Sequence, residues 1–171
     1  MDEYRAVTLA ATPEGRILSG VAVPYEVEAD VRGMRERFAR GSAASSGMAR
    51  LNIDHNLLQP IAEEPASLAF ESRADGLHFR ATLPDTPQSR ALVQMAHDGA
   101  LKGASVEFRA VKQRVAEGVR VIEEAIVNGL ALAIFAKPLY EGAGVTEARA
   151  DATPPETPVL EADAGIQWWQ L

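Results

Sequence analysis

The sequence predicts an α+β domain in which strands predominate. Several segments alternate apolar and polar residues or are rich in β-branched residues, as strands are, and only two have the spacing of amphipathic helices. The 171 residues are 47% hydrophobic and 24% charged, close to the average of globular domains. A chain of this length can bury a core without disulfides or metals.

Two hydrophobic segments and one hairpin motif outline the predicted sheet. Residues 16–25 and 118–135 are rich in β-branched side chains, and the first of them ends at Pro24. Residues 68–83 contain Asp75-Gly76, a pair typical of tight hairpin turns, and are predicted to form two short strands.

Strict alternation predicts two more strands, at residues 50–56 and 102–112. In the first, Asn52 is expected on the polar face and His55 on the apolar face. The second is expected to carry polar side chains on one face and apolar side chains on the other.

Two helices are predicted. The clearer one begins at Asp85-Thr86, a capping pair, followed by Pro87, which is tolerated in a first turn, and it stops before Gly99. A shorter amphipathic helix is predicted within residues 31–42.

The acidic charge is concentrated at the C-terminal end. The net charge is −7, and residues 141–171 hold six acids against one base, which leaves −2 for residues 1–140. We therefore predict one folded domain over residues 1–140 and a flexible acidic Pro/Ala-rich tail over 141–171 that ends in Trp168-Trp169. A nearly neutral body disfavours nucleic acid as a partner.

Composition and motifs exclude several kinds of site. Because there is no cysteine, thiol nucleophiles, disulfides and zinc-thiolate sites are excluded. No metal-ligand motif or phosphate-binding glycine loop is present, so no metal or cofactor is expected. The longest apolar run, Leu130–Ala136, is too short to span a membrane, and no membrane partner is expected.

Few residues offer nucleophilic or acid–base chemistry. Of the three histidines, His78 and His97 are interpreted as structural, whereas His55 could be either a core histidine or a functional one. Ser105 and Glu107 fall on the polar face of the predicted strand 102–112. The string Gly103–Glu107 falls short of a G-x-S-x-G elbow because Glu stands in place of the last glycine.

The order of several short motifs resembles the prohead (capsid maturation) protease family of tailed phages and gene transfer agents. Residues 17–140 carry the resemblance, and each motif is weak alone. The motifs are Leu18–Val23, Glu36–Ser42, Asn52–Asn56, Asp75–Leu77, Leu83–Thr86 and Gly99–Phe108, the last being similar to "G-x-L-x-G-x-S-x-x-F".

The resemblance implies a serine endopeptidase of the herpesvirus assemblin type. The expected fold is a closed or partly open β-barrel flanked by helices, with Ser105 as nucleophile and His55 as general base. The expected substrates are the major capsid protein precursor, scaffold chains and the protease itself. It would act in the bacterial cytoplasm, inside assembling procapsids, and self-association is possible for such an enzyme.

One position departs from the family pattern. Gly129 stands where an acidic third member of the triad is expected. Glu107 is the first candidate to orient His55 instead, with Glu124 and Asn128 as alternatives, or the enzyme could work as a dyad. The competing hypothesis is a catalytically weak relative that serves as a scaffolding factor and binds capsid subunits through its tail.

Overall fold

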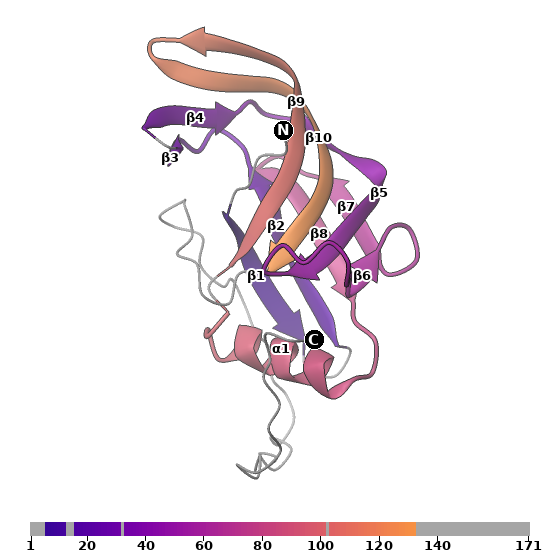
Figure 1. Cartoon of the computed structure of the whole chain (residues 1–171). Coiled ribbons are helices and arrows are strands. Elements are labelled where there is room, and N and C mark those ends of the chain that lie inside the picture. The colour runs from indigo at the N-terminus through magenta and orange to yellow at the C-terminus, as the bar shows by residue number, and fades with distance from the viewer. Residues whose placement is uncertain (1–5, 13–15, 32, 102, 133–171) are drawn as a thin grey trace.

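The computed structural model describes residues 6–12, 16–31, 33–101 and 103–132, and these form a large mixed sheet with one helix (Figure 1). The elements, in chain order, are β1 (Ala6–Thr12), β2 (Ile17–Pro24), β3 (Ala29–Val31), β4 (Met34–Phe38), β5 (Ala43–Ile53), β6 (Ala62–Glu63), β7 (Leu68–Ser72), β8 (Gly76–Thr82), α1 (Pro87–His97), β9 (Ala104–Ala116) and β10 (Val119–Leu132).

The sheet is organised around β10. Its partner on one side is β9, an antiparallel neighbour along nearly the whole strand. On the other side β4 and then β5 pair with it in parallel, one after the other. The chain passes from β4 to β5 through Gly41, whose φ of 71° favours glycine. The remaining strands continue from β9 in the order β1, β2, β8, β7.

The sheet curls on itself without closing. In Figure 1, β5 lies beside β7, and the two strands are in contact. No hydrogen-bonded ladder joins them among the described strands. The described residues therefore form a strand-rich α+β fold with a curled open sheet, and a closed barrel is not found in them.

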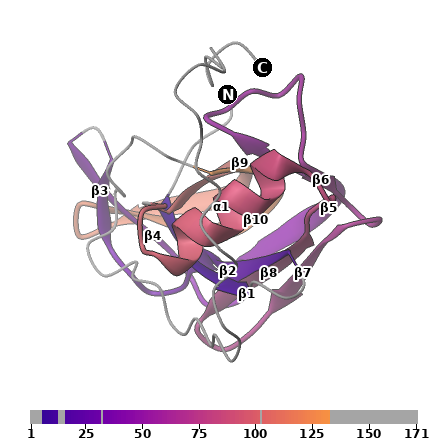
Figure 2. The same ribbon diagram turned by 90° about the horizontal axis from the view of Figure 1, so that it is seen from below.

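The helix covers one end of the curled sheet (Figure 2). It buries Leu92, Val93 and Ala96, and it contacts β1 and β2. The Thr86 side chain accepts a hydrogen bond from the backbone N–H of Ser89, as a capping residue does. The predicted helix is thus confirmed.

The core fills the inside of the curl. Phe38 and Phe108 meet edge to face, with ring centroids 4.9 Å apart, and both are fully buried. An ion pair also lies in this region: Arg120 Nη1 donates to Glu36 Oε2 over 2.7 Å, and Glu36 is only 1% exposed. Because a buried charge without its partner is costly, this pair favours the register of β4 on β10.

The short helix predicted within residues 31–42 is wrong. This segment forms most of a hairpin of β3 and β4, in which Gly33 takes a φ of 83° and its N–H donates to Asp30 Oδ1. Pairing of β4 with β10 supplies backbone hydrogen bonds and buries alternate side chains. These tertiary contacts outweigh the weak local helical spacing.

The other predicted strands are found, some with shifted ends: the strand predicted at 50–56 is the end of β5, which stops at Ile53. The strand in 16–25 is β2, and the hairpin in 68–83 is β7 and β8. Residues 104–112 of the segment 102–112 lie in β9, and residues 119–132 of the region 118–135 form one long strand, β10. The predicted acidic tail at 141–171 lies outside the described residues.

Candidate active site

The candidate site lies on one face of three neighbouring strands, β5, β10 and β9. Asn52, Ala131 and Ser105 lie side by side in one row across these strands. Two residues along, Arg50, Gly129 and Glu107 form the next row. Residues paired in register point to the same face, so the two rows share a surface.

The middle strand, β10, has no large side chain in these two rows. Its two positions in the rows are Gly129 and Ala131, the smallest side chains available. A Cβ added to Gly129 would lie 2.9 Å from Glu107 Oε2 and 3.0 Å from the Arg50 carbonyl oxygen. Such distances are too short for a carbon atom, so the absence of a side chain at Gly129 makes room for the Glu107 carboxylate.

His55 is presented by a sharp turn at the end of β5. Asp54 and His55 have φ of 47° and 63°, and the N–H of Asn56 donates to the Ile53 carbonyl over 2.9 Å. Positive φ at both central residues is the pattern of a type I′ turn, and Asp, Asn and His tolerate it better than most residues. The Asp54 N–H also donates to the Leu132 carbonyl, which fixes the turn to β10.

The turn brings His55 to the Glu107 carboxylate. His55 Nδ1 lies 3.3 Å from Glu107 Oε1, and the Asn52 amide donates from Nδ2 to the same oxygen over 3.4 Å. The side chain of Glu107 is 6% exposed and that of His55 39% exposed. A carboxylate held in this way accepts a hydrogen from Nδ1 and leaves Nε2 as the basic nitrogen of the neutral ring.

The alternation in residues 50–56 predicted the wrong environments for two residues. Asn52 was expected on the polar face but is fully buried, and His55 was expected on the apolar face but lies beyond the strand and is partly exposed. The strand ends at Ile53, because the two positive φ angles that follow interrupt it.

Ser105 and Glu107 project from the same face of β9, two residues apart. Ser105 is partly buried, and its strand neighbours are Ala6 and Ala131. Glu107 was expected to be a polar-face residue, but it is 4% exposed because it leans across Gly129. The structure thus places Ser105 on the strand face that carries Glu107, and Glu107 is the residue that contacts His55.

The two alternative third members lie elsewhere on β10. Glu124 and Asn128 are both exposed. Glu124 is in register with Lys112, toward the far end of the β9–β10 hairpin from the site. The carboxylate that the structure brings to His55 is that of Glu107.

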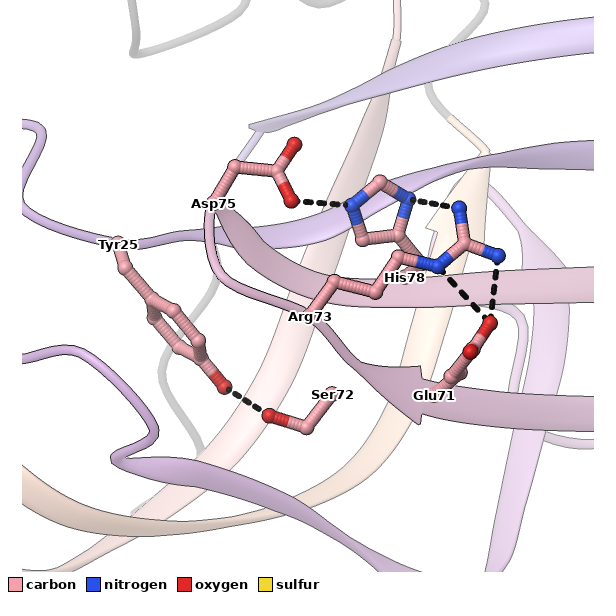
Figure 3. Close-up of polar contacts among 6 residues, drawn as sticks. All are labelled: Tyr25, Glu71, Ser72, Arg73, Asp75 and His78. Atoms are coloured by element: carbon pink, nitrogen blue, oxygen red, sulfur yellow. Dashed lines mark hydrogen bonds and ion pairs between the residues drawn. The ribbon is translucent and has the colours of Figure 1, made fainter.

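His78 belongs to a separate polar cluster at the β7–β8 turn (Figure 3). Its Nε2 is 2.9 Å from Asp75 Oδ1, and its Nδ1 is 3.4 Å from Arg73 Nη1. Arg73 also pairs with Glu71, and its hydrogen bond lowers the pKa of that carboxyl group. The hydrogen bond with His78 lowers the pKa of Asp75.

This cluster braces a hairpin rather than forming a second catalytic site. Both ring nitrogens of His78 face charged groups, and the nearby Ser72 hydroxyl is hydrogen-bonded to the Tyr25 hydroxyl over 3.2 Å. The backbone N–H of Tyr25 donates to the Asp75 carbonyl, which ties the turn to β2. His97, in the last turn of α1, contacts Asp98 over 3.1 Å.

Comparison with protein-family models assigns the chain to a family. Residues 3–154 match the model described as Caudovirus prohead serine protease. The chain belongs to this family. A search of curated proteins and a search of solved structures gave no match.

Membership assigns the prohead protease a general role in capsid maturation of tailed phages. In the described residues, no three metal-ligating side chains cluster, and no helix is long and apolar enough to cross a membrane. The matched region also extends past residue 140, where the sequence predicted the domain boundary.

Sequence reasoning missed the role of two residues. Gly129 was interpreted only as the position where the expected acid is absent, whereas it makes room for the carboxylate of Glu107. Asn52 was assigned only to the polar face of its strand, whereas its amide contacts that carboxylate. The available signal was the pair of small residues, Gly129 and Ala131, on alternate positions of an otherwise bulky strand.

We expect Gly129→Ala to reduce the rate of precursor cleavage by roughly 10²-fold, because the added Cβ must push the Glu107 carboxylate away from His55. A misplacement of about 1 Å can cost that much in an active site. The measurement is kcat for cleavage of a capsid precursor, with urea unfolding to verify the fold. On a Glu107→Gln background the same change should have little further effect, and full activity of Gly129→Ala would contradict this role.

Proposed function

We propose that this prohead protease is a serine endopeptidase with Ser105 as nucleophile, His55 as general base and Glu107 as the third member of the triad. It would cleave the major capsid protein precursor, scaffold segments and its own chain inside procapsids. The observation that carries the proposal is the contact of His55 Nδ1 with the buried carboxylate of Glu107, on the strand that bears Ser105.

The proposed reaction follows from these positions. Ser105 Oγ attacks the scissile carbonyl carbon while Nε2 of His55 takes the hydroxyl proton. The same proton passes to the leaving amine as the C–N bond breaks, and an acyl-enzyme remains. Water then attacks the ester, again with His55 as base, and releases the acid product and the free serine.

The carboxylate has a definite part in this scheme. By accepting the hydrogen of Nδ1, Glu107 favours the tautomer whose Nε2 can take a proton, and its negative charge stabilises the imidazolium that forms. Low exposure strengthens this interaction, because water screens it poorly. This arrangement supports a complete triad despite the glycine at position 129.

Covalent labelling tests the proposal. A fluorophosphonate probe should phosphonylate Ser105 as its Oγ displaces fluoride, and mass spectrometry of the peptides should locate the adduct. A heat-unfolded sample serves as the control, because its serines lack an activating base. Labelling at another serine, or no labelling of protein that still trims capsid precursor, would refute the assignment. Precursor binding without trimming would favour the scaffolding hypothesis.

A further inference from the structure

Asn52 is a fully buried amide with an incomplete set of hydrogen bonds. Its Nδ2 donates to Glu107 Oε1 over 3.4 Å, whereas Oδ1 has no hydrogen-bond partner among the described residues. Leaving a buried amide oxygen unpaired is costly. A residue that served only stability at this position would be better replaced by an apolar side chain, so the amide requires another explanation.

The strand register explains how the Asn52 amide reaches Glu107. Asn52 is on β5 and Glu107 is on β9, with β10 between them. Neighbouring strands are about 4.8 Å apart, so the two side chains must meet over the middle strand. They can do so because β10 is bare at Gly129 and Ala131.

Two side chains of the described residues meet Glu107 at one atom. Asn52 Nδ2 and His55 Nδ1 approach the same carboxylate oxygen, Oε1. The amide approaches from the strand and the imidazole from the turn that follows it. The charged groups around this pair are Asp54, next to His55 in the chain, and Arg50, whose exposed guanidinium pairs with Glu63.

We propose that Asn52 is a positioning residue that holds the Glu107 carboxylate in its orientation against His55 Nδ1. This inference rests on the proposed function for its catalytic consequence, but the contact itself does not. Without the amide, the carboxylate of Glu107 can rotate away from the imidazole. The Nδ1–H tautomer of His55 then loses the acceptor that favours it.

The test compares Asn52→Leu with wild type by two readouts. The first is the tautomer of His55 from ring ¹⁵N shifts in histidine-labelled protein, at a pH where imidazole is neutral. We expect predominantly Nδ1–H in wild type and a shift toward Nε2–H in the variant. His78 and His97 are internal controls, because both lie outside the site. An unchanged His55 tautomer would overturn the proposal.

The second readout is a double-mutant cycle on cleavage of capsid precursor. Asn52→Leu should lower kcat roughly tenfold or more, as loss of an orienting partner does at other histidine sites, with little change in KM. On a Glu107→Gln background it should have little further effect, because the amide acts through that carboxylate. Additive losses would overturn the proposal.

A matched variant separates positioning from stability. Ser42→Ala removes the other buried side-chain atom without a partner in the described residues, Ser42 Oγ, in the loop just before β5. It should keep the tautomer and kcat of wild type. If Asn52→Leu instead loses activity only in proportion to unfolding, the residue is structural and the proposal is wrong. The tautomer measurement needs no substrate. It therefore tests the positioning role of Asn52 even if the labelling of Ser105 fails.

Discussion

Replacement of Ser105 by alanine is expected to abolish cleavage of the capsid precursor, with a fall in kcat of about 10⁶-fold. The variant has no hydroxyl to form the acyl-enzyme, so only direct attack of water on the bound peptide remains. Ser105 is partly buried on β9 in a position that alanine fits without a clash, because the change only removes an atom. The fold and the binding of precursor should therefore persist.

The measurement is the yield of trimmed precursor on co-expression, followed by kcat with purified proteins. Ser19→Ala is the matched control, because Ser19 is also a partly buried serine on a strand, β2, and lies outside the site. A Ser105→Ala, His55→Ala double variant should be no slower than either single variant, since the two residues act as a unit. Trimming by Ser105→Ala at the wild-type rate would contradict the serine mechanism.

Replacement of Glu107 by glutamine should lower kcat by about 10⁴-fold, the loss known for a triad whose acid is changed to its amide. Glutamine has nearly the same size as glutamate, so it fits over Gly129. It lacks the charge that stabilises the imidazolium. Its NH₂ group can also donate to Nδ1, which stabilises the tautomer that cannot accept the serine proton at Nε2.

The two alternative third members supply the controls for this prediction. Glu124→Gln and Asn128→Ala change exposed residues of β10 and should keep wild-type rates. Rates are compared under substrate saturation, after urea unfolding has verified each fold. If Glu124→Gln loses activity and Glu107→Gln keeps it, the third member has been assigned to the wrong strand.

The elements with strong local signals could be predicted from the sequence. Three segments contain residues that favour their structure locally: the Asp75-Gly76 turn, the capping pair before Pro87 and the β-branched run of β10. The structure confirms all three. The segment 29–38 carried no comparable signal. It forms a hairpin because β4 pairs in parallel with β10, 81 or more residues away, and this pairing stabilises the extended backbone.

The sequence by itself determined the kind of chemistry. A cysteine-free chain with three histidines and the ordered motifs of a prohead protease directs attention to Ser105 and His55. Only the tertiary structure shows which of the candidate carboxylates contacts His55. The pairing of β5, β10 and β9 brings Asn52, Gly129 and Glu107 together from three distant segments, and no local pattern encodes that register. Because Gly129 has no side chain, the Glu107 carboxylate can lie against β10 at this position.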